Sequence, residues 1–227
     1  MARARVSCDD KRMSDRITRV ILLTGPSEQP PLVSMLQRHN PALDIRPVQD
    51  RKAVAQACAE ATPTTRLLAV CTSVIVPGDA LARLSGPAYN FHPGPPTRPG
   101  RYPAVFALYD GDDRFGFTVH EMRASVDSGP IVAVEWFKTP DGGLGELEGL
   151  SIQRLELMFD RLLPHLAHDV RPLPHLDVAW SGRKTTYAQA MALCRVTNDM
   201  SPEEVARRRR ACGMVIEMSD PGWVEPD

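Results

Sequence analysis

Strands and helices alternate along the first third of the chain, and this alternation limits the fold more than any other feature. Short apolar runs at residues 19–25, 43–49 and 66–76 are predicted to be strands. Helical patterns lie between them, one ending near residue 39 and one spanning 51–62. Such a βαβαβ order forms a mostly parallel sheet with helices on both faces. The sequence therefore predicts a Rossmann-like α/β fold, in which ligands lie beyond the carboxyl ends of the strands.

The middle of the chain predicts a hairpin and a long helix. After the helical segment "YPAVFALYDG", residues 114–122 and 128–138 read as two strands joined by a Gly-Pro turn. Residues 151–168 then form a helical pattern, with one apolar face that we expect to pack inward. The apolar positions of that face are Ile152, Leu155, Leu157, Met158, Leu162 and Leu163.

A last helix is predicted within "SPEEVARRRRACG". Ser201 is the expected N-cap, Pro202 the first helical residue and Gly213 the residue after the end. Glu204 is expected to complete a capping box with Ser201. The run 207–210 consists of arginines that wind around the helix, so we expect them to face solvent or pair with acids rather than converge on one phosphate.

Composition excludes several classes of partner. The chain has 227 residues, 43% of them hydrophobic, which is enough for one sizeable core with an appendage. Its formal net charge of -1 gives no field that would gather nucleic acid or bind an anionic membrane. No apolar run approaches the roughly 20 residues of a membrane span, and the N-terminus lacks the apolar core of a secretion signal. We therefore expect a cytoplasmic protein without nucleic-acid or membrane partners.

Metal-binding patterns are weak. The five cysteines are scattered without any C-x-x-C pairing, which argues against a disulfide framework and a zinc site: Cys8, Cys58, Cys71, Cys194 and Cys212. His165 and His168 lie three apart on a predicted helix and could share a face, but no third ligand is apparent nearby. No metal is expected.

The stretch "AYNFHPGPPTRPG" carries the first candidate functional residues. Asn90 and His92 are two apart in a predicted strand, so they share one face, while Phe91 points to the other. An amide N–H and an imidazole N–H that converge on one point can stabilise a carbonyl oxygen as it becomes an oxyanion. The prolines and glycines that follow predict a stiff loop able to wall a pocket.

Three motifs taken together resemble the folate-dependent formyltransferase superfamily, which includes methionyl-tRNA, glycinamide ribonucleotide and sugar N-formyltransferases. They are "NFHPGPPTRPG", "GFTVHEM" and "VDSGPIV", in the order and spacing of that superfamily. The positions that match its pattern are Asn90, His92, Pro93, Gly100, Gly116, Thr118, His120, Asp127, Gly129 and Ile131. The resemblance implies a formyltransferase-type Rossmann-like domain at residues 16–180. A disordered tail at 1–15 and a short C-terminal helical extension at 181–227 would flank it.

The resemblance also implies an activity and a site. Asn90, His92 and Asp127 would form a catalytic trio that transfers a formyl group from 10-formyltetrahydrofolate to a small-molecule amine. Thr118 and His120 are secondary positions, and His120 is read as a hydrogen-bonded structural histidine. The resemblance implies contacts to the folate donor at Val74, Ile75, Pro93, Gly94, Gly100 and Gly129. The sequence does not decide whether the protein forms a homodimer.

Departures from the family pattern bear on the substrate. The loop "GPPTRPG" stands where the folate enzymes commonly have Ser-Leu-Leu-Pro, so the cover of the pterin is changed. The turn "TGPSEQPPL" has one glycine and three prolines, and prolines donate no N–H to a phosphate, which disfavours the glycinamide ribonucleotide branch. The short, non-basic tail disfavours a tRNA substrate.

Two other functions remain open at this level. A 10-formyltetrahydrofolate hydrolase would use the same trio with water in place of the amine. A non-catalytic or repurposed member of the fold would bind another acyl carrier or a nucleotide, and the altered loop favours this reading.

Overall fold

A six-stranded sheet forms the framework of the computed structural model, which describes residues 16–218. Its strands run in the order β2-β1-β3-β4-β5-β6. β1 pairs in parallel with β2 and β3, and β3 pairs in parallel with β4. The strand bounds are Arg19–Leu23, Asp44–Val48, Thr65–Val70, Tyr89–His92, Arg114–Glu121 and Ile131–Lys138 for β1 to β6. The predicted mostly parallel α/β sheet is confirmed, and the predicted tail at 1–15 lies outside the described residues.

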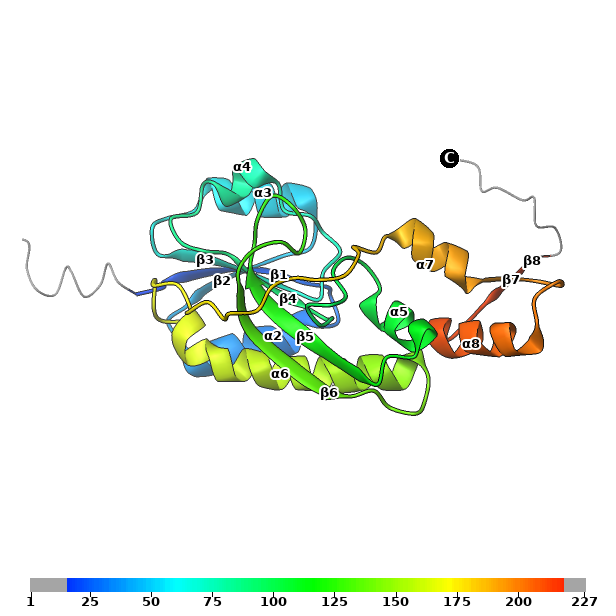
Figure 1. Cartoon of the computed structure of the whole chain (residues 1–227). Helices are drawn as coiled ribbons and strands as arrows, with labels where there is room; N and C mark the ends of the chain where they lie inside the picture. Colours follow the sequence, from blue (N-terminus) through cyan, green and yellow to red (C-terminus); the bar gives the residue numbers. More distant parts are fainter. Residues whose placement is uncertain (1–15, 219–227) are drawn as a thin grey trace, which may run out of the picture. The chain divides into compact units, whose positions relative to one another are not determined.

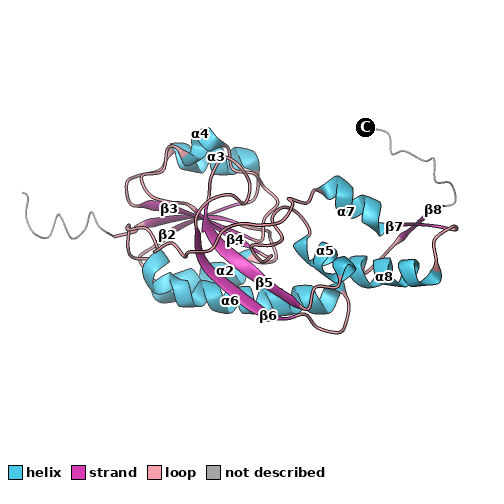
Figure 2. Ribbon diagram, viewed as in Figure 1, coloured by secondary structure: helices cyan, strands magenta, loops and turns pink. Residues whose placement is uncertain are grey.

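Helices cover both faces of this sheet (Figure 1). α3 (Arg51–Ala59) and α4 (Gly78–Leu81) lie on one face, and α2 (Gln29–His39) and α6 (Leu144–Leu166) lie on the other (Figure 2). The remaining elements are α5 (Pro103–Asp110), α7 (Tyr187–Cys194), β7 (Arg195–Thr197), α8 (Pro202–Cys212) and β8 (Ile216–Met218). β7 and β8 pair in parallel as a separate two-stranded sheet.

The described chain falls into two compact units. The first comprises residues up to 92, with 119–133 and 155–177. The second comprises 93–118, 134–154 and the described residues from 178 onward. The division expected after residue 180 stays a prediction. None of the helices between residues 16 and 218 is long and apolar enough to cross a membrane.

The strand predicted at 66–76 ends earlier, at Val70. Cys71 takes a left-handed backbone conformation with φ of 47°, which ends the extended path. Its N–H donates to the carbonyl of Phe91 at 3.2 Å. Residues 71–76 therefore form a loop beyond the carboxyl end of β3, on the side where ligands of such sheets bind.

The helix predicted at 151–168 is longer at its start, because α6 begins at Leu144. Ile152 and Leu157, predicted to pack inward, are instead exposed. They fall outside the stripe of positions spaced three or four apart that meets the core. The buried stripe consists of Leu147, Ser151, Leu155, Met158, Phe159, Leu163 and Leu166.

A buried arginine fixes the end of α6 in the first unit. Arg66 on β3 is among the largest fully buried side chains. Its guanidinium donates to the backbone carbonyls of Leu166, Val170 and Arg171, each at 3.2 Å, and lies 5.5 Å from the ring centre of Tyr89. Burial lowers the pKa of this guanidinium. The guanidinium thus caps the Leu166 carbonyl at the end of the helix and ties the segment after it to β3.

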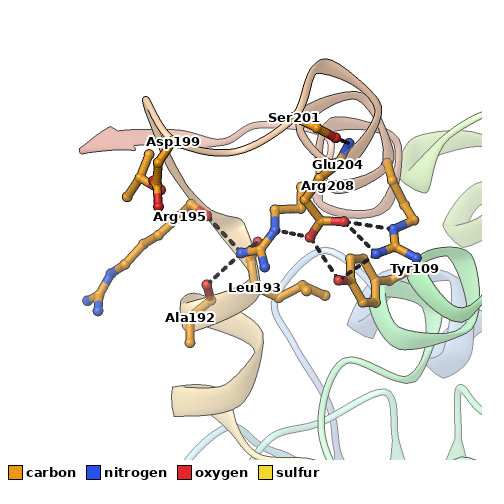
Figure 3. A network of polar contacts seen from close by, with 10 residues as sticks. Tyr109, Ala192, Leu193, Arg195, Asp199, Ser201, Glu204 and Arg208 are labelled. Atoms are coloured by element: carbon orange, nitrogen blue, oxygen red, sulfur yellow. Dashed lines mark hydrogen bonds and ion pairs between the residues drawn. The ribbon is translucent and has the colours of Figure 1, made fainter. Parts of the chain in front are cut away.

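The predicted cap of α8 is confirmed in part. Ser201 is the N-cap and accepts from the N–H of Glu204 at 3.2 Å, and Gly213 follows the helix. The capping box is wrong, because the Glu204 carboxylate instead accepts from the Tyr109 hydroxyl at 2.8 Å and from Arg208 Nε at 2.6 Å (Figure 3). Arg207 binds the same carboxylate.

The arginine run of α8 is engaged within the second unit. Arg208 Nη1 donates to the carbonyls of Ala192, Leu193 and Arg195, at 2.9 to 3.2 Å, and so caps the end of α7 (Figure 3). Arg210 donates to the carbonyls of residues 140 and 142. The expected pairing with an acid is found for Arg207 and Arg208.

The Glu204 network predicts a pH-dependent contribution to stability. Hydrogen bonds from Arg208, Arg207 and Tyr109 lower the pKa of Glu204 from 4.5 to about 2. A carboxyl group with a lowered folded-state pKa stabilises the fold above its unfolded pKa, and this stabilisation is lost as the pH falls through the folded value. We expect Glu204→Gln to lower the melting temperature at pH 7, and the difference from the original protein to shrink below pH 4.5. Thermal melts followed by circular dichroism across this range measure the effect.

Glu203→Gln is the matched control, since Glu203 lies in the same first turn of α8. It removes a similar charge near the helix N-terminus but leaves the Tyr109 and Arg208 contacts in place. Equal melting temperatures for the two variants at pH 7 would contradict the network's role.

Candidate functional site

Alternation along β4 separates a core face from a polar face. Phe91 is fully buried and its ring meets that of Phe159 edge-on, with centroids 5.1 Å apart. Asn90 and His92 alternate with Phe91, so they project from the opposite face of the strand. The prediction that these two residues share a face, away from Phe91, agrees with this alternation.

Four polar side chains meet beside that face, all within the first unit. Asn90 Nδ2 lies 3.1 Å from His120 Nε2. His120 Nε2 also lies 3.3 Å from Asp127 Oδ1. The second carboxylate oxygen of Asp127 lies 3.6 Å from His92 Nδ1. The carboxylate therefore sits between two imidazole rings, and one of those rings contacts the Asn90 amide.

The orientation of His120 follows from a backbone contact. Its Nδ1 lies 2.8 Å from the carbonyl oxygen of Glu121. A carbonyl can only accept, so Nδ1 carries the hydrogen and donates it. In the neutral ring Nε2 is then an acceptor, and it receives the hydrogen bond of the Asn90 amide.

The loop after β5 holds Asp127 in an unusual conformation. Asp127 has φ of 43°, in the left-handed region that aspartate and asparagine tolerate better than most residues. The loop is closed by the N–H of Glu121, which donates to the carbonyl of Pro130 at 2.9 Å. At Gly129 a Cβ atom would lie 1.9 Å from the carbonyl oxygen of Glu121, so only glycine fits. Gly129 thus shapes the loop that carries Asp127.

Burial strengthens the electrostatics of this cluster. The side chains of His92, His120 and Asp127 are 5%, 3% and 3% exposed. Charges interact more strongly where water is excluded, and an unpaired buried carboxylate is costly. The His92 ring, whose Nδ1 lies 3.6 Å from the carboxylate, is the partner with which Asp127 can share a proton.

The arrangement is suited to carbonyl chemistry. An amide N–H and an imidazole N–H can both donate to an oxygen that gains negative charge. A carboxylate next to an imidazole favours the positively charged ring and can accept a proton. Attack of a nucleophile on an acyl group needs both stabilisation of the oxyanion and removal of a proton.

The residues predicted to contact the folate donor are less closely grouped than the polar cluster around Asp127. Val74 packs against a hydrophobic cluster of the first unit, whereas Ile75 beside it is exposed. Gly94 belongs to the second unit, where its carbonyl accepts from the Thr118 hydroxyl at 2.8 Å. Pro93 and Gly100 lie in that unit too, and a Cβ at Gly100, whose φ is 98°, would collide with the backbone of Thr185. Thr118, Gly94 and Gly100 thus have local structural contacts of their own.

The histidines at 165 and 168 make other contacts. His165 Nε2 is 2.9 Å from the carbonyl of Arg171, and His168 Nε2 is 3.0 Å from that of His39. Within residues 16–218, no group of three or more His, Cys, Asp or Glu side chains could hold a metal ion.

Two residues gain importance from the structure. His120, ranked as secondary from the sequence, contacts both Asn90 and Asp127. Glu121, which the sequence reading passed over, is buried at the end of β5. The sequence signal for both was the pair of ionisable residues that ends an otherwise apolar strand, "FGFTVHE".

Comparison with known proteins agrees with the motifs. The sequence model of the formyl transferase family matches residues 22–139. The fold is similar to that of a candidate sugar N-formyltransferase from Mycobacterium tuberculosis, with a TM-score of 0.68 and 18% identity over 86% of this chain and 87% of that one. A sugar N-formyltransferase from a Shewanella species gives a TM-score of 0.66 and 17% identity over 86% and 87% of the two chains.

A third similar structure contains ligands. It is the N-formyltransferase from Helicobacter canadensis in complex with folinic acid and dTDP-3-aminofucose, with a TM-score of 0.65 and 12% identity over 86% of this chain and 80% of that one. At such identities the likeness extends to the fold alone. No curated protein matches the chain.

Proposed function

This chain belongs to the formyl transferase family, whose members are enzymes of one-carbon group transfer, and on that premise we propose that it moves the formyl group of 10-formyltetrahydrofolate to a small-molecule amine. Asn90, His92 and Asp127 carry the reaction. The observation on which the proposal rests is the buried contact of the Asp127 carboxylate with His92, on the strand that also bears Asn90.

Each of the three side chains has one chemical task. The amine attacks the formyl carbon, and the formyl oxygen becomes an oxyanion in the tetrahedral intermediate. Asn90 and His92 donate hydrogen bonds to this oxygen, each worth about 3 to 4 kcal/mol in the transition state. Asp127 keeps His92 in its donating form and takes up the proton that the attacking amine loses. The intermediate then collapses as the bond between the formyl carbon and N10 of the folate breaks, and this proton passes to N10, so that tetrahydrofolate leaves.

His120 acts as a positioning residue for this trio. Its Nε2 accepts from the Asn90 amide, which keeps the NH2 group, rather than the carbonyl, on the side of the two imidazoles. The same nitrogen lies 3.3 Å from Asp127 Oδ1, so the ring also borders the carboxylate.

Two exposed apolar side chains support a site for the folate donor in the first unit. Ile75 lies in the loop after β3, and Val126 directly precedes Asp127. Large exposed apolar residues on loops beside a polar site commonly contact ligands. Structures of related fold have been determined in complex with folinic acid or tetrahydrofolic acid. The predicted contacts at Ile75, Val74 and Gly129 are part of this proposal, whereas those at Pro93, Gly94 and Gly100, which belong to the second unit, stay predictions.

We propose that the acceptor is a small amine, and that no phosphate group of this acceptor binds at the turn between β1 and α2. Three prolines near the start of α2 remove N–H donors from that helix end. Glu28, the residue before the helix, adds a carboxylate at the same place. A sugar amine fits this description, and one similar structure contains dTDP-3-aminofucose.

The test measures donor binding first and turnover second. Calorimetric titration with folinic acid, a stable formyl folate, is expected to give saturable binding, whereas an acyl-CoA of similar size is not. Conversion of 10-formyltetrahydrofolate to tetrahydrofolate is then followed with a panel of amino sugars and other primary amines. Turnover that depends on an amine supports the proposal.

Two outcomes would replace the proposal. Formate release at the same rate with and without amines would identify a hydrolase. Binding of the acyl-CoA but not of folinic acid would indicate a repurposed member of the fold.

A further inference from the structure

We propose that Cys194 and Cys212 form a redox-active dithiol, which hydrogen peroxide converts into an intramolecular disulfide between α7 and α8. Both cysteines are free thiols in the second unit, and each is the last residue of its helix. Neither residue belongs to the polar cluster around Asp127, so this modification site is independent of formyl transfer.

A side chain of α8 holds the end of α7 beside the two cysteines. Arg208 Nη1 donates to three backbone carbonyls around Cys194, at 2.9 to 3.2 Å (Figure 3). Cys212 lies four residues after Arg208 on α8, and residues at this spacing project from the same face of a helix. The face of α8 that carries Cys212 is therefore turned toward the end of α7.

The strands that follow the two helices hold their ends together as well. Arg195, directly after Cys194, is the first residue of β7. It pairs in parallel with Ile216, the first residue of β8, which lies four residues after Cys212. The two chain segments that leave the cysteines thus run side by side, so the fold fixes the pair from both directions.

The two thiols contact each other. The Cys212 thiol is hydrogen-bonded to that of Cys194, so a small approach separates the sulfurs from the roughly 2 Å of an S–S bond. Cys194 is 9% exposed and Cys212 is partly exposed, which makes Cys212 the more accessible sulfur. Burial and the contact with Cys194 raise the pKa of Cys212 to about 12. At neutral pH the pair is therefore protonated and reacts slowly, which protects it from weak oxidants.

One molecule of hydrogen peroxide balances the reaction. The sulfur of Cys212 attacks a peroxide oxygen, the O–O bond breaks, and the released hydroxide takes the Cys212 proton and leaves as water. The sulfur of Cys194 then attacks the resulting sulfenic acid, the S–O bond breaks, and the second hydroxide leaves as water with the Cys194 proton. The two thiols lose two electrons and two protons, and the peroxide is reduced to two waters.

The first experiment maps the bond in the full chain. The protein is treated with hydrogen peroxide, the remaining thiols are alkylated, and tryptic peptides are analysed by mass spectrometry. We expect the peptides of Cys194 and Cys212 to be linked, two hydrogens lighter than their sum, and to separate after treatment with dithiothreitol. Peroxide that leaves both residues as thiols, oxidises them to sulfinic acids or links either one to a different cysteine would overturn the proposal.

The second experiment measures the effect of the bond on stability. A disulfide restrains the unfolded chain between residues 194 and 212, so peroxide is expected to raise the melting temperature by about 5 to 10 °C. This rise is expected to be absent in Cys194→Ala. Each variant is compared with itself before and after oxidation, so a loss of stability caused by the substitution cancels.

Cys58→Ala is the matched control. Cys58 is another buried thiol, but it packs in the hydrophobic cluster of the first unit, where burial raises its pKa to about 11. The rise in melting temperature is expected to persist in this variant. An equal rise in Cys194→Ala and in the original protein would show that a different reaction of peroxide stabilises the chain, and the proposal would fail.

Discussion

Replacing Asp127 with asparagine is expected to lower the kcat of formyl transfer by about 10²- to 10⁴-fold, while the Kd for folinic acid changes only a few-fold. The substitution removes the charge that stabilises the His92 imidazolium and the oxygen that takes up the amine proton. Asparagine tolerates the left-handed conformation of residue 127, so the loop should keep its shape. Steady-state kinetics with an amine that supports turnover measures kcat, and calorimetry measures the Kd.

The control for this substitution is Asp160→Asn. Asp160 also accepts from a histidine, His39, but it is part-exposed on α6 and pairs with Arg38. We expect the kcat of the Asp160→Asn variant to match that of the original protein. A kcat of Asp127→Asn within about threefold of the original would refute the proton-accepting role, which predicts at least a 10²-fold loss.

Replacing Arg66 with methionine is expected to lower the free energy of unfolding by about 3 to 5 kcal/mol. Methionine fills much of the space of the arginine stem but removes the donor to the carbonyls of Leu166 and Val170, whereas the Arg171 carbonyl keeps its contact with His165. Buried carbonyls without partners are costly, and the contact with the Tyr89 ring is lost as well. Urea denaturation followed by circular dichroism gives the free energy.

Arg38→Met provides the comparison for a surface arginine. Arg38 pairs with Asp160, but its side chain is 61% exposed, so the loss is expected to be at most about 1 kcal/mol. Equal losses for Arg66→Met and Arg38→Met would mean that the carbonyls of Leu166 and Val170 find other partners, water included.

Much of the fold could be predicted from local pattern. The alternation of apolar strands and amphipathic helices predicted the parallel sheet, and the signals around Ser201 and Gly213 predicted the bounds of α8. The end of β3 could not be predicted in this way, because Val74 and Val76 continue the apolar run while Cys71 turns the backbone. The role of Arg66 could not be predicted either, since its acceptors lie about a hundred residues away along the chain.

The site was predictable to the extent that it depends on alternation and motif spacing. The period of a strand put Asn90 and His92 on one face, and the family resemblance pointed to Asp127. His120 was ranked lower because its neighbours along the strand are apolar, and only the pairing of β5 beside β4 brings its ring to Asn90.

The proton on Nδ1 of His120 is held by a main-chain oxygen, that of residue 121. Every amino acid supplies the same oxygen, so the tautomer of this ring is independent of which side chain follows it. A substitution at position 121 would therefore leave the hydrogen on Nδ1 of His120 and keep Nε2 of that ring facing Asn90.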